Sequence, residues 1–209
     1  MRTLAVSALA ACALGCPSTS MYRSAEPVPA GRWQASLLAG AGALADRETG
    51  ARSPTGYGAL GLQRGLTDDV DVGVRLYTVG LSALATLRFV HRGRWSVAVA
   101  PELSVARTPT TTTTTNAFHL FAAATVPVTY RLSRTWAFSA GPSLGGGVYL
   151  PEAGGRAGGM WLGAFVNVEA RLGERWWLVP EVSGYNVVVG DVPLRGGLFT
   201  AGLGLRFGF

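Results

Sequence analysis

The sequence predicts an all-β fold, an antiparallel up-and-down transmembrane β-barrel of about ten strands. Apolar residues alternate with small or polar residues along most of the chain, which is the period of a strand with one apolar face. Gly makes up 29 of the 209 residues, and only 14% of the residues are charged. Because Gly loses the most backbone freedom on ordering, this composition disfavours helices. Short polar breaks also alternate with longer irregular ones, as in a barrel with turns at one end and loops at the other.

The N-terminus has the features of a secretory signal peptide. Arg2 provides a positive charge, and the apolar stretch from Leu4 to Leu14 is too short to cross a bilayer as a permanent helix. We therefore expect residues 1–16 to form the signal peptide and the protein to be exported.

The only two cysteines of the chain, Cys12 and Cys16, lie in this leader. The sequences Leu9-Ala-Ala-Cys12 and Ala13-Leu-Gly-Cys16 resemble the lipobox of bacterial lipoproteins. The resemblance implies that the cysteine carries lipid and becomes the mature N-terminus. We expect lipidation at Cys16, with Cys12 as the alternative, because cleavage before Cys12 would leave an unusually short leader. A signal peptide without lipidation is the other possibility.

Residues 17–31 are rich in Pro, Ser and Ala and show no periodicity, which predicts a flexible linker. The predicted barrel then covers residues 32–209. Its ten expected strands lie near 32–43, 55–65, 70–79, 81–90, 95–107, 117–132, 136–149, 159–172, 176–188 and 197–209. An even number of strands places both ends of the barrel sequence on the same side. Eight strands are the alternative if a hairpin near Gly80 is absent.

Four predicted strands start with a tryptophan. These residues are Trp33, Trp95, Trp136 and Trp176. Because an indole ring is most stable at the boundary between lipid headgroups and hydrocarbon, the four residues predict an aromatic girdle on the periplasmic side. The alternative is that they pack in the core of a soluble β-sandwich.

Two stretches carry a family resemblance. The Arg-Gly-Leu-Thr-Asp turn within Arg64–Gly73 resembles periplasmic turns of bacterial outer-membrane β-barrel proteins. The ending Leu205-Arg-Phe-Gly-Phe209, with Phe207 and Phe209, resembles the C-terminal signal that the outer-membrane assembly machinery recognises. The resemblance implies integral insertion in the bacterial outer membrane, with membrane lipid and the assembly machinery as partners.

Prolines are the sequence feature that fits the predicted barrel least well. Pro101, Pro127, Pro142 and Pro180 lie inside predicted strands, where proline removes a hydrogen-bond donor from the ladder. We therefore expect that some of these strands bulge or that the predicted register is wrong at these positions.

Ten charged residues fall on the face predicted to point inward. They are Arg32, Asp71, Arg75, Arg88, Glu102, Arg131, Glu169, Arg171, Glu181 and Arg206. They would form either a mutually neutralised network in a narrow lumen or the lining of a narrow channel for small solutes. The first is expected, since wide aqueous pores need about sixteen strands.

The sequence contains little that points to catalysis or to a cofactor. His119 has no serine beside it on its strand face, and the two histidines lack the cysteines of a typical metal site. Gly56-Tyr-Gly-Ala-Leu-Gly61 matches a nucleotide-binding pattern by letter but is not followed by a helix. Basic residues are dispersed, which argues against nucleic acid as a partner. We therefore expect a non-enzymatic structural or interaction protein of the envelope without cofactor or metal, a narrow channel being the alternative and a lipid-modifying enzyme a minor one.

Overall fold

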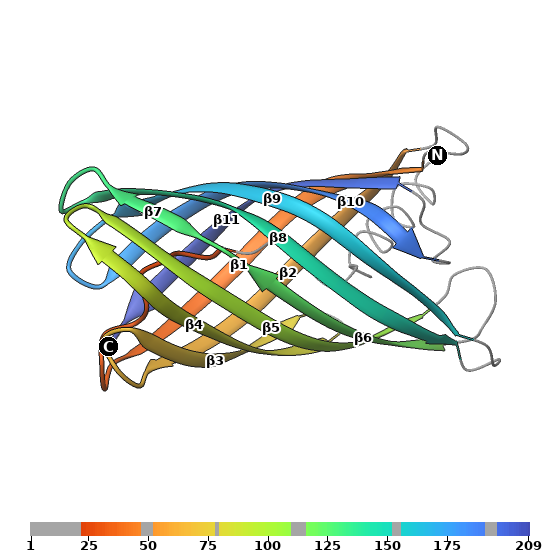
Figure 1. Cartoon of the computed structure of the whole chain (residues 1–209), viewed down its shortest axis with the longest axis horizontal. Coiled ribbons are helices and arrows are strands. Elements are labelled where there is room, and N and C mark those ends of the chain that lie inside the picture. The colour runs from red at the N-terminus through yellow and green to blue at the C-terminus, as the bar shows by residue number, and fades with distance from the viewer. Residues whose placement is uncertain (1–21, 47–51, 78–79, 110–115, 152–155, 191–195) are drawn as a thin grey trace, which may run out of the picture.

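The computed structural model describes residues 22–46, 52–77, 80–109, 116–151, 156–190 and 196–209, which form one sheet rolled into a barrel (Figure 1). The described part of the chain contains no helix long and apolar enough to cross a membrane. The strands are β1 (Trp33–Asp46), β2 (Arg52–Gly65), β3 (Val70–Tyr77), β4 (Gly80–Arg92), β5 (Trp95–Pro109), β6 (Asn116–Thr125), β7 (Val128–Arg131), β8 (Trp136–Pro151), β9 (Ala157–Arg171), β10 (Trp176–Gly190) and β11 (Gly196–Gly208).

The barrel is closed and antiparallel, and it has ten strands. The neighbour order is β4, β3, β2, β1, β11, β10, β9, β8, β6 and β5, and β5 pairs back with β4. Both β6 and β7 lie between β5 and β8, so they are two halves of one strand interrupted at Val126 and Pro127. The predicted ten strands are confirmed, and the hairpin around Gly80 is present.

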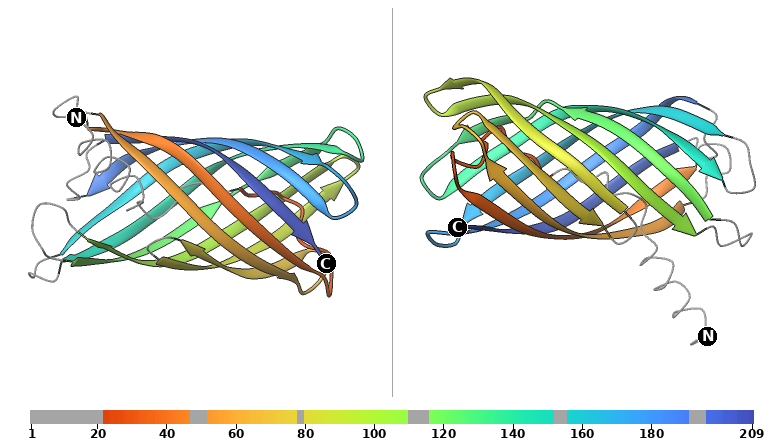
Figure 2. Two further views of the ribbon diagram at one scale, coloured as in Figure 1. Left: turned by 180° about the vertical axis from the view of Figure 1, so that it is seen from behind. Right: turned by 90° about the horizontal axis from the view of Figure 1, so that it is seen from below.

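The C-terminus completes the barrel against its first strand. β1 and β11 pair along their whole length, and the backbone groups of Trp33 and Phe209 exchange two hydrogen bonds of 2.9 Å. Both ends of the barrel sequence therefore lie at the same end of the barrel, together with the four short turns of residues 66–69, 93–94, 132–135 and 172–175 (Figures 1 and 2). We call this the turn end and the opposite end the loop end.

The two faces of the sheet follow the alternation in the sequence. Outward side chains are mostly large and apolar and are exposed, among them Leu37, Val72, Leu103 and Leu203. Inward positions hold small or polar residues and a few apolar ones, for example Ser82, Thr129 and Leu38. No second layer of the described chain covers the outward side chains, so the β-sandwich alternative is wrong.

Each of the four strand prolines lies where pairing with one neighbour is interrupted. The β4–β5 register omits Pro101, and the β9–β10 register omits Pro180. Pro127 separates β6 from β7, and Pro142 lies opposite this break, where its carbonyl accepts a hydrogen bond from Val126. The missing donors thus coincide with local breaks in the pairing with one neighbouring strand. The two register shifts in these pairs lie elsewhere, between Arg88 and Val90 and between Val187 and Val189.

Residues 22–30 differ from the prediction for the linker 17–31. They enter the barrel at the turn end and run inside it, where Tyr22 to Ala25 and Val28 are buried (Figures 1 and 2). The linker prediction is therefore corrected for these residues, because the barrel wall supplies hydrogen-bond and charge partners that the local sequence does not reveal. We call Tyr22–Ala30 the luminal segment. Residues 1–21, including the predicted signal peptide and both cysteines, lie outside the described residues.

We predict that Leu203→Arg destabilises the folded barrel in lipid vesicles by about 2–4 kcal/mol, because Leu203 points outward near the middle of β11 and a charge at mid-bilayer is costly. Equilibrium unfolding in urea measures this change. Val188→Arg, near the loop end of β10, is the control and should cost about 1 kcal/mol or less. Equal costs at the two positions would contradict a lipid-facing outer surface.

Candidate functional site

The luminal segment enters the barrel beside β2. The amide of Gly31 donates to the carbonyl of Gly65, and the amide of Gly65 donates to the carbonyl of Arg32, at 2.9 and 3.0 Å. A side chain at position 65 would overlap the backbone of Pro29, so glycine is required for this close approach. The contact directs the preceding residues into the lumen.

Side chains of the barrel wall accept the backbone hydrogen bonds of the luminal segment. The amide of Tyr22 donates to Glu181, that of Ala25 to the Thr129 hydroxyl at 2.8 Å, and that of Val28 to Asp71 at 2.8 Å. A buried amide without an acceptor is costly, and this segment joins no strand ladder within the barrel interior. These wall residues therefore hold the segment in place.

Wall residues also donate to the carbonyls of the segment. The Asn167 side-chain amide donates to the carbonyl of Arg23 at 2.9 Å, and the guanidinium of Arg206 donates to the carbonyl of Tyr22. Arg206 also forms an ion pair of 3.0 Å with Glu169. Donors and acceptors of the same stretch are thus satisfied by β9, β10 and β11 together.

Arg23 joins a buried charge cluster around Glu102. Its guanidinium lies 2.9 Å from the Glu102 carboxylate, and Arg75 lies 3.8 Å from the same group. The Tyr77 hydroxyl donates to Glu102 at 2.6 Å. Desolvating charges costs several kcal/mol per ion unless partners compensate, and here one carboxylate is shared by two guanidinium groups and a phenol.

Tyr22 fills the middle of the lumen. It belongs to a buried cluster with Leu38, Ala59, Tyr77 and Val179, and Tyr57 and Trp177 pack against this cluster. The Tyr22 hydroxyl donates to the carbonyl of Ala39 at 3.2 Å and lies 3.2 Å from the Tyr57 hydroxyl. A side chain at position 202 would overlap both tyrosine hydroxyls, so the glycine of β11 makes room for this ring.

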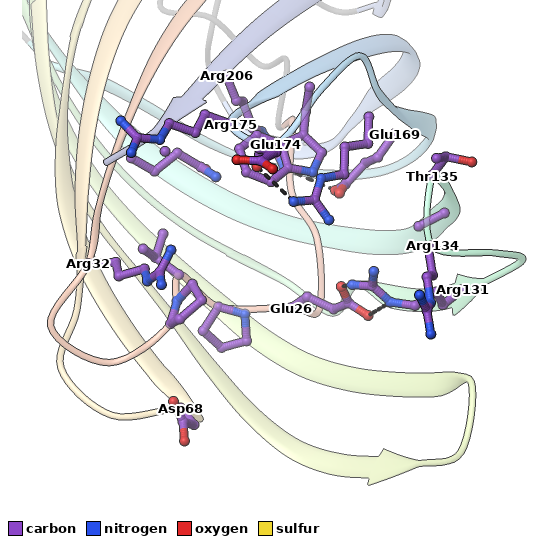
Figure 3. A pocket seen from close by; sticks show the side chains of 18 of the residues that line it. Glu26, Arg32, Asp68, Arg131, Arg134, Thr135, Glu169, Glu174, Arg175 and Arg206 are labelled. Atoms are coloured by element: carbon purple, nitrogen blue, oxygen red, sulfur yellow. Dashed lines mark hydrogen bonds and ion pairs between the residues drawn. The ribbon is translucent and has the colours of Figure 1, made fainter.

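A cavity of about 560 Å³ remains between the luminal segment and the turn end (Figure 3). We call it the vestibule. Residues of the segment, including Glu26, form part of its wall, and Glu26 and Arg131 point toward one another as an ion pair (Figure 3). A second ion pair at this end joins Arg88 and Asp69 at 2.8 Å.

The structure divides the ten predicted inward charges into two groups. The first is buried or nearly buried and contacts the luminal segment directly or through another member of the group; it comprises Asp71, Arg75, Glu102, Glu169, Glu181 and Arg206. The second lines the vestibule and comprises Arg32, Arg88, Arg131 and Arg171. Glu169 and Arg206 of the first group also line the vestibule, so the two groups lie at different depths and meet at this ion pair.

Sequence reasoning missed Tyr22 and Arg23, which complete the inner group. The charged residues of the barrel wall could have indicated that a further partner is needed in the lumen. Among the described residues, the buried or nearly buried positions of the wall carry the acids Asp71, Glu102, Glu169 and Glu181 and the arginines Arg75 and Arg206. Such an imbalance in a low-dielectric interior calls for a further cation and further donors.

The four tryptophans of the predicted girdle all lie at the turn end, and each begins a strand. Trp33, Trp95, Trp136 and Trp176 are all exposed, between 37% and 52%. Arg64 lies over the ring of Trp33, and Trp95 and Trp176 contact Tyr130 and Phe207 with ring centroids 4.6 and 4.7 Å apart. Phe207 and Phe209 extend this aromatic rim.

The two histidines lie in different surroundings. His119 is half-buried and stacks on Phe121, which has an edge contact with Trp161. His91 Nδ1 lies 3.0 Å from the Ser96 hydroxyl, but Ser96 is only 1% exposed and is not accessible to a substrate. Among the described residues no group of three or more His, Cys, Asp or Glu side chains is placed to hold a metal ion.

Comparison with known proteins shows a likeness of fold. No protein-family model and no curated protein matches the chain. An outer-membrane channel from Pseudomonas putida F1 superimposes with a TM-score of 0.59 and 10% identity, over 88% of this chain and 97% of that one. The outer-membrane protease OmpT of Escherichia coli gives 0.47 and 9%, over 85% and 96%. Neisserial surface protein A gives 0.46 and 10%, over 85% and 97%.

At these identities the likeness extends to the fold alone. The chain therefore has the fold of bacterial outer-membrane β-barrel proteins. In such barrels the short turns face the periplasm and the longer loops face outward.

We predict that Glu102→Gln lowers the free energy of unfolding by about 3 kcal/mol, because it leaves Arg23 and Arg75 buried without their shared carboxylate. Urea titration of the barrel in lipid vesicles measures the loss. Glu174→Gln, which removes an exposed acid at the turn end, should change stability by about 0.5 kcal/mol or less. Similar effects for the two variants would show that the lumen does not bury the charge cluster.

Proposed function

We propose that this protein is a non-enzymatic envelope protein whose barrel is closed to solutes and acts in the outer membrane as a scaffold for its external loops. The observation that carries the proposal is the luminal segment. It crosses the turn-end half of the lumen, and its Tyr22 ring occupies the middle among residues of several strands. The interior of a ten-stranded barrel is narrow, and the luminal segment occupies much of it.

The electrostatics of the lumen support the same proposal. A selective channel needs charged or polar groups that a passing solute can contact. Here Glu102, Glu169 and Arg206 are engaged with other protein groups. A solute would have to displace these partners, and each displacement would leave a buried charge uncompensated.

Export and anchoring belong to the same proposal and rest on the sequence. The leader 1–16 would direct export, and Cys16, or alternatively Cys12, would carry lipid. The assembly machinery would recognise Phe207 and Phe209, and the position of Phe209 at the aromatic rim, 53% exposed, supports this.

A narrow channel that opens when the luminal segment leaves is the second candidate. The observation that favours it is the vestibule of about 560 Å³, which ends at the segment itself. The two candidates differ in whether the segment remains in place under conditions that transport requires.

We predict that the wild-type protein shows no conductance above leak in planar bilayers, because the luminal segment fills the lumen. Replacing residues 22–28 with a glycine and serine sequence of equal length should produce stable conductance steps. Heat-modifiable migration on gels verifies that each variant is folded before recording.

A second variant changes less of the luminal segment, so that a folding defect caused by replacing residues 22–28 can be recognised. Tyr22→Ala removes only the central ring and should give smaller or briefer openings. Steady conductance of the wild type would favour the channel candidate. Folded variants that all remain silent would show that the segment is not the barrier.

A further inference from the structure

The vestibule carries more positive charge than its own contacts use. Seven arginines but only four acids line it, namely Arg32, Arg88, Arg131, Arg134, Arg171, Arg175 and Arg206 against Glu26, Asp68, Glu169 and Glu174. The cavity is concave and is surrounded by protein, which has a lower dielectric constant than water. The electrostatic field of these charges is therefore concentrated within the cavity.

Four of the seven guanidinium groups have partners in the protein. Arg131, Arg206 and Arg88 form ion pairs with Glu26, Glu169 and Asp69. Arg171 donates to the carbonyls of Gly173 and Glu174 at 2.8 and 2.7 Å. These groups are neutralised or tied to the rim.

The other three arginines are available. Within the described residues, the side chains of Arg32, Arg134 and Arg175 make no hydrogen bond or ion pair, and all three residues are exposed. They come from three places around the mouth, which are the entry to β1, the β7–β8 turn and the β9–β10 turn (Figure 3). Their charges therefore surround the cavity.

We propose that the vestibule binds a multivalent anion that carries phosphate or carboxylate groups and arrives from the periplasm. The planar guanidinium group donates two parallel hydrogen bonds to either anion. Because the three available arginines come from separate elements, a ligand with several anionic groups satisfies them better than a single monovalent ion. The site is independent of whether the lumen conducts, so it extends beyond the proposed function.

Glu26 of the luminal segment provides an internal competitor for the proposed anion. Its carboxylate already occupies Arg131 in the same cavity, in the way that one anionic group of a ligand would. A bound anion would therefore compete with Glu26 for Arg131. Removing this internal competitor should strengthen binding, whereas removing the available arginines should weaken it.

Isothermal titration of the full-length protein in phosphatidylcholine nanodiscs tests the site, with sodium tripolyphosphate as the probe and sodium citrate as a carboxylate probe. We expect saturable binding. The triple variant R32Q/R134Q/R175Q should weaken it by about tenfold or more, and Glu26→Gln should tighten it. The matched control R64Q/R92Q/R94Q removes three arginines that do not line the vestibule and should change the affinity less than about twofold.

The outcomes separate the alternatives. Equal weakening by the two triple variants, absence of saturable binding, or weaker binding after Glu26→Gln would overturn the proposal. Nanodiscs that contain phosphatidylglycerol distinguish the source of the anion. A lower apparent affinity for tripolyphosphate in them identifies a lipid headgroup as the ligand, and an unchanged affinity identifies a soluble anion.

Discussion

The structure depends on neutralising the acids that the barrel wall buries. Asp71, Glu102, Glu169 and Glu181 point into a narrow interior, and the wall supplies only Arg75 and Arg206 in return. The luminal segment supplies the rest through the Arg23 guanidinium and two backbone amides. Since an uncompensated buried charge is strongly destabilising, the wall and the segment stabilise each other.

Small inward residues make this arrangement sterically feasible. Serines, threonines and glycines on the inner face leave room for an extra stretch of chain, and some of the hydroxyl groups pair with each other, as those of Ser183 and Thr200 do at 2.7 Å. On the outer face, the exposed leucines and valines form the apolar surface expected of a membrane barrel, and the polar groups lie in the interior. The same alternation of residues therefore sets the position in the membrane and the chemistry of the lumen.

The ten strands and the tryptophan-led strand starts could be predicted because both are local. A period of two and a turn signal are visible within a dozen residues, and β11, for example, keeps its parity from end to end. The luminal segment could not be predicted, because it has no period and its partners are distant in sequence. Tyr22 and Glu181, for example, are 159 positions apart. The available arginines of the vestibule likewise become visible only when the turns are placed around one mouth.

Amide hydrogen exchange of the unmodified protein in lipid vesicles, followed by mass spectrometry, tests the central claim most directly. Because the amides of Tyr22, Ala25 and Val28 donate to wall side chains, peptides covering residues 22–30 should exchange as slowly as those of the strands. Exchange of this region within seconds, while the strands remain protected, would show that the lumen does not hold the segment and that its acids are neutralised in another way.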